Sequence, residues 1–392
     1  MGLMRRMQLV HISIIIVSYN TKEVTINCLL SVYQNHPKQP FEVIVVDNNS
    51  SDGSCKAIER DFPEVILIKN SENAGFAAAN NQGIEISNGE YVLLLNPDTI
   101  VLPNALNKML AFIDNNPQAG AVTSKKWIDE GKTIQSPLLH PFTIRQYIFR
   151  YTFLGKLFPS NTVFKKMWGK DIEALLSQEP LEVDCFPGSC MMVRRDVIKK
   201  AGLLDERFFM FFEDIDWCFR IKKAGYKLFL IPAAEIVHLV SQSPSGNLSK
   251  IYRSSMVYYL KKHYRRPVIW FLNMLLLFFR GLSKVLSHFN LGNEKGSEAA
   301  KLLTSQYMLH WPTISFAKKY ILTISMDSTF INKGFSIVEK NSFEVPLNLL
   351  NRWPDGHYFW KIAPLYENGR IGEFSTPKIF KKFKTGKESL TQ

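Results

Sequence analysis

The stretch that decides the fold is ISIIIVSYN at residues 12–20, an apolar run that ends in polar side chains. Two further runs have the same form, VIVVD at residues 43–47 and YVLLLNPD at residues 91–98. Aliphatic runs without polar alternation are typical of strands that are buried on both faces of a parallel sheet. The polar ends of these runs are therefore predicted to meet at the carboxyl edge of one sheet, where α/β proteins bind ligands.

Segments with helical character separate the strand-like runs through about residue 135. The segments expected to be helical are 24–33, 54–61 and 75–86, and residues 65–69 are expected to form a further strand. This alternation predicts an α/β domain with a mostly parallel, Rossmann-like sheet and right-handed crossovers.

The pattern beyond residue 135 is less regular. Residues 138–180 have weak periodicity and are expected to form a mobile insertion over the site. Residues 183–193 and 227–231 are expected to be strands, with a helix through Lys223 between them. A strand-like segment at 234–237 leads into His238.

The formal net charge of +13 on the 392 residues lies in the last third of the chain. Residues 1–249 hold 26 Lys and Arg against 26 Asp and Glu. The later basic residues flank an apolar segment at 268–279, which favours an anionic membrane surface over nucleic acid as the partner. A membrane span needs about 20 apolar residues. We therefore expect an amphipathic helix in the membrane plane within 268–289, with a true span or a helix packed on the enzyme as alternatives.

Five cysteines without a CxxC pair predict reduced thiols in a cytoplasmic protein. Arg5 and Arg6 precede a short apolar run that imitates a signal peptide but has no cleavage site, so a mature N-terminus is expected. The expected location is the cytoplasm, at the inner face of the plasma membrane.

From about residue 305, short strand-like segments with turn signals replace the α/β alternation and predict a small all-β sandwich. The segments 311–330 and 354–375 resemble a fibronectin type III module. Alternation places the side chains of Tyr358, Trp360 and Ile362 on one face, in the core. The predicted domains are a catalytic domain at 9–265, a helical membrane-associating linker at 266–304 and a β-sandwich at 305–385.

Six short motifs follow one another in the first 265 residues. They are VSYN at 17–20, VVDNNSSDG at 45–53, NAGFAAANNQG at 73–83, LNPD at 95–98, GS at 188–189, and FFEDIDWCFR at 211–220 followed by His238. Together they resemble family 2 glycosyltransferases of the GT-A fold, and among them the bacterial rhamnosyltransferase-like branch. The resemblance implies an inverting, metal-dependent enzyme that transfers a sugar, first of all L-rhamnose from dTDP-rhamnose, to a lipid-linked or cell-surface polysaccharide acceptor.

The resemblance places the nucleotide-sugar donor at the ends of the first strands. The implied donor contacts are Ser18, Tyr19, Asn20, Asp47, Asn73, Gly75, Phe76, Asn80, Asn96 and Asp98. A carboxylate at Asp47 can accept hydrogen bonds from a base or ribose, or it can cap the turn at 48–53. Tyr19 can stack on the base or lie in the core. The helix start at Gly75 offers N–H groups to a diphosphate, with a purely structural helix start as the alternative.

The implied metal ligands are Asp98 and His238, which would hold Mg²⁺ or Mn²⁺ against the diphosphate. Asn96 stands where many family members have an aspartate, so ligation depends mainly on Asp98. An imidazole ligand at His238 suits Mn²⁺ better than Mg²⁺.

The adjacent acids Glu213 and Asp214 follow an aromatic run that would desolvate them. Burial and mutual repulsion raise the pKa of a carboxyl group, as a general base for a sugar hydroxyl requires. By the family pattern Asp214 is the base and Glu213 contacts the acceptor or the backbone, while Gly188 and Ser189 line the acceptor.

Asp216 and Arg220 have the i, i+4 spacing of a helical ion pair, with a phosphate contact for Arg220 as the alternative.

Other functions compete with this interpretation. The donor can be a UDP-linked galactofuranose, hexose or hexosamine, or the chain can be a non-catalytic glycan-binding scaffold. A dinucleotide oxidoreductase is disfavoured because no Gly-x-Gly-x-x-Gly follows the first strand. The sequence leaves a homodimer open.

Overall fold

The computed structural model describes residues 10–151, 162–239, 248–272, 274, 275, 277, 307–326 and 333–382. The chain divides into two compact units. Unit 1 comprises Met1–Lys126, Leu138–Ile144 and Lys166–Met274, and unit 2 comprises Trp127–Pro137, Arg145–Lys165 and Leu275–Gln392.

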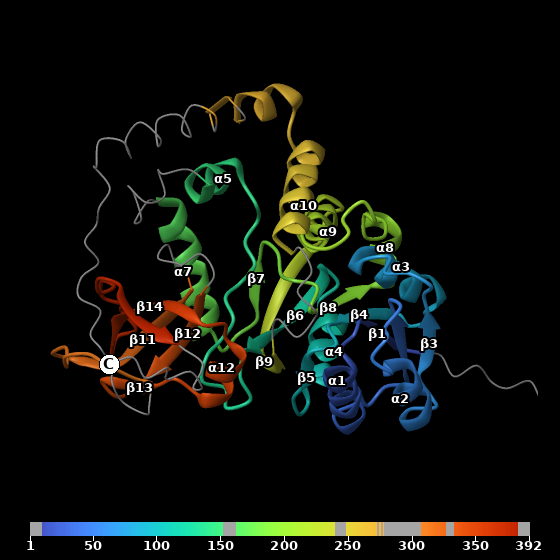
Figure 1. The fold of residues 1–392 in the computed structure, drawn as a ribbon, viewed down its shortest axis with the longest axis horizontal. Coiled ribbons are helices and arrows are strands. Elements are labelled where there is room, and N and C mark those ends of the chain that lie inside the picture. The colour runs from blue at the N-terminus through green and yellow to red at the C-terminus, as the bar shows by residue number, and fades with distance from the viewer. Residues whose placement is uncertain are drawn as a thin grey trace, which may run out of the picture. The chain divides into compact units, whose positions relative to one another are not determined.

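Unit 1 is built on one sheet with the strand order β3-β2-β1-β4-β8-β6-β9-β5, and β7 pairs with β9 (Figure 1). The strands are β1 Ile12–Ser18, β2 Phe41–Asp47, β3 Ile66–Lys69, β4 Tyr91–Leu95, β5 Thr99–Val101, β6 Ala119–Trp127, β7 Leu181–Val183, β8 Cys190–Arg194 and β9 Lys227–His238. The pairs β1–β2, β1–β4 and β2–β3 are parallel, as predicted. Strand β8 pairs antiparallel with β4 and β6, and β9 pairs antiparallel with β5 and β7.

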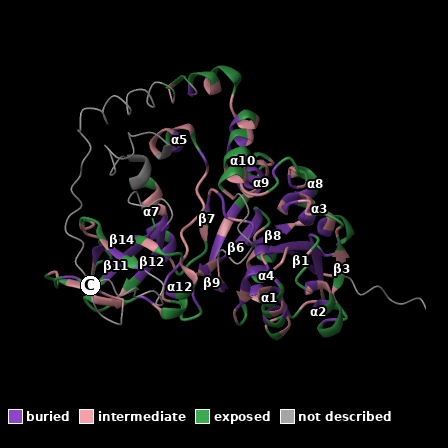
Figure 2. Ribbon diagram, in the orientation of Figure 1, coloured by how far each residue is buried: buried purple, intermediate pink, exposed green. Residues whose placement is uncertain are grey.

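Helices cover both faces of this sheet (Figure 1). They are α1 Lys22–Gln34, α2 Ser54–Asp61, α3 Phe76–Ile86, α4 Ala105–Asn115, α8 Arg195–Ala201, α9 Glu213–Lys223 and α10 Leu248–His263. Ile14 and Ile16 of β1 join a core with α1, α2 and α4, whereas Ile15 and Val17 join a core with α3, α8 and α9. Both faces of β1 are therefore buried (Figure 2), which is why its sequence shows no polar alternation. The predicted α/β fold class is confirmed.

Two strand predictions need correction. The single strand expected at 183–193 is two strands, β7 and β8, because the loop 184–189 between them leaves the sheet. The strands expected at 227–231 and 234–237 are one strand, β9, that continues through Pro232. Strand β7 pairs with Leu228–Leu230 and β5 with Ile236–His238, so the proline, which has no N–H, lies between these two paired stretches.

The expected insertion at 138–180 contains two helices, α5 Ile144–Tyr151 and α7 Thr162–Leu176. Residues 152–161 lie outside the described residues. In unit 1 the buried Asp171 of α7 accepts hydrogen bonds from Leu138 N at 3.1 Å and, at 2.8 Å, pairs with His140 Nε2. Apolar periodicity does not reveal polar contacts such as those of Asp171. The weak periodicity of 138–180 therefore did not predict these two helices.

Unit 2 contains the β-rich end of the chain. Its elements are β10 Met308–His310, β11 Ala317–Ser325, β12 Lys333–Val338, β13 Ser342–Glu344, α12 Leu347–Arg352, β14 Gly356–Tyr366 and β15 Lys378–Lys382. An antiparallel sheet has the order β12-β11-β14-β15, and β10 pairs with β13. Tyr358, Trp360 and Ile362 of β14 lie in its core, as predicted. The fibronectin type III resemblance stays a prediction.

An unexpected segment completes unit 2. Residues 127–137, which begin at the last residue of β6, belong to unit 2. Ile134 is 1% exposed in its core. Gln135 and Phe335 exchange backbone hydrogen bonds of 2.6 and 3.0 Å, and Arg352 Nη2 donates to Ile128 O at 2.8 Å. Gly334 has to be a glycine here, because a Cβ at this position would lie 2.3 Å from Ile134 Cγ2.

The segment predicted to contact the membrane is helical over residues 266–272. Its large apolar side chains are exposed, with Trp270 at 67% and Phe271 at 60%. Among the described residues, no helix has the length and apolar character needed to cross a bilayer. The part of the prediction that covers 278–304 lies outside the described residues.

Candidate active site

Asp98 and His238 meet at the edge of the sheet of unit 1. Strand β5 begins just after Asp98, and its antiparallel register with β9 pairs Thr99 with His238. As a result His238 Nε2 lies 3.1 Å from Asp98 Oδ1. The same nitrogen lies 3.3 Å from Asn96 Nδ2. Asn96, Asp98 and His238, which the sequence analysis predicted to contact the donor or the metal, therefore lie next to one another.

The loop 184–189 connects this point to the acid pair. Ser189 O accepts a hydrogen bond from Asn96 N at 3.0 Å. Its neighbour Gly188 donates its N–H to Asp214 Oδ2 at 3.2 Å. The predicted acceptor residues thus lie between the predicted metal ligands and the predicted base.

The start of α3 packs against the other side of the loop. A Cβ on Gly188 would lie 3.1 Å from the Phe76 ring and 3.9 Å from Asp214 Cβ. Gly75 has φ +87°, and a Cβ there would lie 2.5 Å from Phe209 O, so the position requires glycine. Phe76 N donates to Phe209 O at 2.7 Å, and Gly75 N donates to Asn73 Oδ1 at 3.0 Å. These two N–H groups, which were expected to be free for a diphosphate, are already bonded within the protein.

The ends of β1 and β2 are linked to each other. Asn48 N donates to Ser18 O at 2.8 Å, and Asn20, at φ +50°, accepts from Ser51 N at 2.7 Å. Asp47 is 1% exposed and its Oδ1 accepts from Ser50 N at 2.8 Å, which is the capping role that the sequence left open. Asn48 Nδ2 then donates to Gly75 O at 3.2 Å, which joins these loops to α3.

Asn80 and Tyr19, two further predicted donor contacts, have different surroundings. Asn80 is 1% exposed and donates to Phe76 O at 2.8 Å within its own helix, which is a structural role. Tyr19 is partly exposed, so its ring is not part of the core.

The acid pair begins α9 after a strained turn. Phe211 and Phe212 both have left-handed backbones, at φ +71° and +70°, which bulky residues rarely adopt. Such strain costs about 1–3 kcal/mol per residue and concentrates at functional sites. Here it turns the chain so that Glu213 and Asp214 stand in the first turn of α9.

The two acids have different surroundings. Asp214 accepts hydrogen bonds from Ile215 N at 2.8 Å and from Gly188 N. Burial raises the pKa of Asp214, and these two N–H groups oppose that rise. Burial and then the charge of Asp214 raise the pKa of Glu213 well above its usual range. Glu213 Oε2 has no hydrogen-bond partner among the residues that the structure describes. The carboxylate form is therefore better supported at Asp214.

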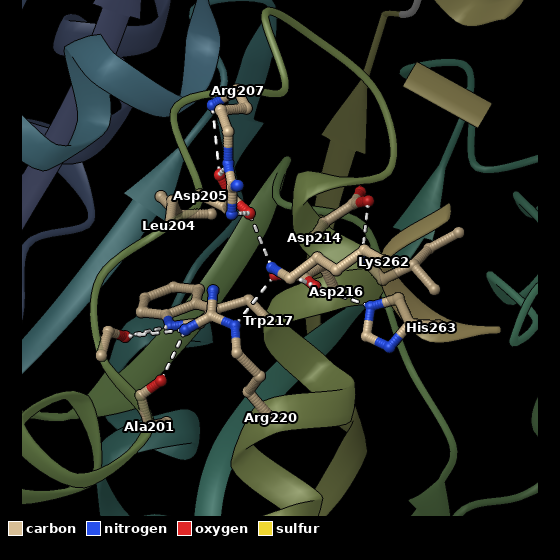
Figure 3. Close-up of polar contacts among 12 residues, drawn as sticks. Ala201, Leu204, Asp205, Arg207, Asp214, Asp216, Trp217, Arg220, Lys262 and His263 are labelled. Atoms are coloured by element: carbon tan, nitrogen blue, oxygen red, sulfur yellow. Dashed lines mark hydrogen bonds and ion pairs between the residues drawn. The ribbon is translucent and has the colours of Figure 1, made fainter. Parts of the chain in front are cut away.

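The third acid of this turn, Asp216, forms a buried ionic network (Figure 3). Its side chain is 0% exposed and contacts Arg220 Nε at 2.8 Å, Lys262 Nζ at 2.7 Å and His263 Nε2 at 2.8 Å. Lys262 also contacts Asp205 at 2.7 Å. The predicted pair of Asp216 and Arg220 is confirmed. Because Lys262 and His263 end α10, the network fastens this helix to the helix that begins with the acid pair.

One buried charge on the sheet was missed in the sequence. Lys126 of β6 is 7% exposed, and its Nζ donates to Thr123 Oγ1 at 2.9 Å. No motif contains it, and a buried lysine is uncommon unless it is paired, which is the signal that singles it out once burial is known.

Within the described residues no group of three His, Cys, Asp or Glu side chains can hold a metal by itself. Asp98 Oδ1 and His238 Nε2 lie in contact, and Asn96 Oδ1 beside them is buried without a hydrogen-bond partner in the described part of the chain. Oxygen and imidazole donors of this kind fit a divalent cation whose remaining ligands come from a diphosphate and water.

Known proteins are similar to this chain. The model of Glycosyl transferase family 2 matches residues 13–202. The N-acetylglucosaminyl-diphospho-decaprenol L-rhamnosyltransferase of Mycobacterium tuberculosis is 28% identical over 251 residues, which cover 59% of this chain and 80% of that protein. The dTDP-rhamnosyl transferase RfbF of Shigella flexneri is 24% identical over 58% of this chain and 68% of its own. A crystal structure of GalNAc-T7 with UDP, GalNAc and Mn²⁺ aligns at a TM-score of 0.44 and 16% identity, over 64% of this chain and 49% of that one.

The matched region contains all of β1 but its first residue, β2 through β8 and the loop 184–189, and the acid pair of α9 lies beyond its end. The order of the motifs, their meeting at one edge of the sheet and the family match all indicate the same family. The chain therefore carries a glycosyl transferase family 2 domain of the GT-A fold class and is a glycosyltransferase.

Proposed function

We propose that the protein is an inverting glycosyltransferase that moves L-rhamnose from dTDP-rhamnose to a lipid-linked or cell-surface polysaccharide acceptor. The names of two relatives, an L-rhamnosyltransferase and a dTDP-rhamnosyl transferase, support this donor. The observation that carries the proposal is one series of contacts, from Asp98 and His238 through Asn96 and Ser189 to Gly188 and Asp214.

Asp214 is the general base in this proposal. Its carboxylate takes the proton of an acceptor hydroxyl while the hydroxyl oxygen forms a bond to the anomeric carbon. The bond from that carbon to the nucleoside diphosphate breaks, and its electron pair leaves with the diphosphate. One displacement inverts the anomeric centre. The N–H groups of Gly188 and Ile215 each hold one oxygen of the carboxylate and so fix its orientation toward the acceptor.

Asp98 and His238 are the proposed protein ligands of Mn²⁺ or Mg²⁺, with Asn96 Oδ1 beside them. When bound, the ion supplies positive charge that neutralises the diphosphate leaving group. Asp98 contributes a hard oxygen ligand, and His238 contributes a nitrogen that favours Mn²⁺.

The nucleotide is proposed to lie along the ends of β1 and β2. Tyr19 is partly exposed there and can stack on the base, and the turn that Asp47 caps shapes the adjoining wall. The N–H groups of Gly75 and Phe76 already donate to Asn73 and Phe209. The next backbone donors of α3 for a phosphate or sugar oxygen are therefore the N–H groups of Ala77 and Ala78.

We further propose that the protein works in the cytoplasm, at the inner face of the plasma membrane. Trp270 and Phe271 expose large apolar rings on the helical residues 266–272. Arg265 and Arg266 precede them, and positive charge beside exposed aromatics suits an anionic lipid surface. A lipid-linked acceptor would be presented at the same surface.

The decisive experiment offers purified protein and MnCl₂ a panel of donors: dTDP-L-rhamnose, UDP-galactofuranose, UDP-glucose and UDP-N-acetylglucosamine. N-acetylglucosaminyl-diphospho-decaprenol serves as the acceptor, and mass spectrometry reports the product. We expect a mass increase of one deoxyhexose from dTDP-L-rhamnose only, and none with Asp214→Asn. A product from a UDP-sugar alone would replace the proposed donor. Full turnover by a folded Asp214→Asn would remove the proposed base.

A further inference from the structure

The turn before the acid pair needs support from other parts of unit 1. Phe211 and Phe212 have φ angles of +71° and +70°, a conformation in which the Cβ of a bulky residue is crowded by its own backbone. A backbone of this kind persists only where the surrounding structure holds it. Glu213 and Asp214 follow at once as the first residues of α9. The contacts that hold Phe211 and Phe212 therefore also set the direction of the two acids.

Helix α10 supplies rings that pack on this turn. Phe212 is 3% exposed, and its ring centroid lies 5.2 Å from that of Tyr252 and 5.5 Å from that of Tyr259. The Phe211 ring lies 5.6 Å from the Tyr252 ring in an edge-on arrangement. Phe142 adds a third ring at 5.1 Å from Phe212. Aromatic rings attract one another at these separations, so Phe212 is held by three rings, two of which come from α10.

The same helix also binds the backbone just before the left-handed residues. Ser255 of α10 is 4% exposed, and its Oγ donates a hydrogen bond of 2.8 Å to Met210 O. One residue earlier, Phe209 O accepts from Phe76 N of α3 at 2.7 Å. Two consecutive carbonyl groups are therefore bonded to two different helices, α3 and α10.

The ionic network of Asp216 fixes the end of α10 on α9. Lys262 and His263 of α10 contact Asp216 of α9 at 2.7 and 2.8 Å (Figure 3). The Tyr259 ring lies 4.5 Å from the His263 ring, so the ionic contacts and the packing on the turn are neighbours on one helix. Neither the sequence motifs nor the family match, which ends at residue 202, includes α10.

We propose that Tyr252, Ser255 and Tyr259 are positioning residues, which hold the left-handed turn and thereby orient the carboxylate of Asp214 toward the acceptor hydroxyl. Their spacing of i, i+3 and i+7 places them on one face of α10. They act through the backbone of the turn and not by contact with the substrate. This inference rests on the proposed role of Asp214 as the general base.

A misoriented base slows the reaction step without weakening donor binding. Proton removal and attack on the anomeric carbon need the carboxylate, the hydroxyl and the carbon in one geometry, and a misplacement of about 1 Å lowers the rate by about 10²-fold. The proposed nucleotide contacts lie at the ends of β1 and β2, outside this turn. Loss of the support from α10 should therefore lower kcat and leave the KM for the donor near its wild-type value.

Ser255→Ala and Tyr259→Leu test the proposal in assays with dTDP-L-rhamnose, MnCl₂ and N-acetylglucosaminyl-diphospho-decaprenol. The first variant removes the hydrogen bond to Met210 O, and the second removes a ring that packs on Phe212. We expect kcat to fall about tenfold in each variant, with an unchanged KM for the donor. Ser255→Thr and Tyr259→Phe, which keep the hydroxyl and the ring, should retain most of the wild-type kcat.

Leu260→Ala is the matched control for lost stability. Leu260 is 5% exposed in the same helix, but it has neither a ring to pack on Phe212 nor a hydroxyl to donate to Met210. This variant should have a lower melting temperature and the wild-type kcat at a temperature where both proteins are folded. An unchanged kcat in folded Ser255→Ala and Tyr259→Leu would overturn the inference. So would an equal loss of kcat in Leu260→Ala.

Hydrogen exchange at the start of α9 is a second measurement, and it does not depend on activity. Phe212 O accepts the N–H of Asp216 at 2.9 Å, which is the first hydrogen bond of the helix. This amide should exchange faster in Ser255→Ala and Tyr259→Leu than in the wild type, because the turn opens more often without its support. Val257→Ala changes a 39% exposed residue of α10 and should leave the exchange unchanged. Equal exchange in the wild type and both test variants would overturn the inference.

The proposed base and the proposed support fail separately. Full turnover by a folded Asp214→Asn would contradict the base itself. An inactive Asp214→Asn, combined with a wild-type kcat in Ser255→Ala and Tyr259→Leu, would contradict only the positioning role of α10.

Discussion

His238 Nε2 lies 3.1 Å from Asp98 Oδ1, although the two residues come from distant parts of the chain. The cause is the pairing of Thr99 in β5 with His238 at the end of β9. This short antiparallel pairing joins β5, which follows the parallel strand β4 in the chain, to β9, the last strand of the sheet in the sequence. Because Asn96 contacts the same imidazole nitrogen, the three side chains form one polar point at the edge of unit 1.

This pairing predicts a metal-dependent effect of His238→Ala. Loss of one proposed ligand should raise the MnCl₂ concentration needed for half-maximal activity, and loss of charge stabilisation of this kind lowers kcat by about 10²-fold. The measurement is activity after EDTA treatment, titrated with MnCl₂. His310→Ala, an exposed histidine of unit 2, is the control and should behave as wild type. An unchanged MnCl₂ midpoint in His238→Ala would speak against ligation.

Glu213→Gln should change how stability depends on pH. Burial and the charge of Asp214 raise the pKa of Glu213 in the folded state. A raised carboxyl pKa contributes stability at low pH that is lost as pH rises through the folded pKa. Glutamine never ionises, so we expect the melting temperature of the variant to gain on wild type as pH increases. Thermal unfolding between pH 5 and 9 measures this, and parallel curves would contradict it.

Asp216→Asn should destabilise unit 1. Removing one partner of a buried ionic network costs about 3–5 kcal/mol, because the remaining charges stay buried. In a domain of this size each kcal/mol lowers the melting temperature by about 2–4 °C. The lowered pKa of Asp216 means that this stabilisation exists near neutral pH and is lost on acidification. Asp61→Asn, which breaks the exposed pair with Arg60, is the matched control and should leave the melting temperature close to that of the wild type. Equal losses in both variants would refute the prediction.

Ile134→Ala should destabilise unit 2, although Ile134 precedes the β-rich region by far in the sequence. Truncating a buried isoleucine costs about 2–5 kcal/mol. Limited proteolysis of the C-terminal region should become faster in this variant. Ile337→Ala removes an isoleucine of β12 that is 38% exposed and should have little effect.

The same packing predicts that a truncation before residue 307 is not neutral, because it removes the partners of Ile134 and Gln135. A truncated protein with the wild-type melting temperature would contradict this.

Trp270→Ser combined with Phe271→Ser should weaken binding to anionic vesicles. Burying a large apolar side chain contributes about 1.5–3 kcal/mol, so the partition coefficient should fall at least tenfold. Flotation with phosphatidylglycerol vesicles measures it, with phosphatidylcholine vesicles as the uncharged comparison. Leu347→Ser, a leucine of unit 2 that is 65% exposed, is the control. Unchanged flotation of the double variant would exclude this helix as the membrane contact.

The local elements of this protein were readable from its sequence. The strand β4 and the helix α2 have the predicted bounds, and β1 and β2 lie where apolar runs end in polar side chains. Burial on both faces leaves a continuous apolar run, and that signal is local to each segment. The order of the motifs was also enough to indicate the family and the residues of the candidate site.

Tertiary structure alone decided which segments meet. Periodicity says that a side chain is buried but does not name its partner. It therefore could not show that Thr99 pairs with His238, or that Ile134 completes the core of unit 2. The left-handed turn at Phe211 and Phe212 was equally invisible, because phenylalanine has no preference for that conformation. Long-range packing imposes it, and with it the position of the acid pair.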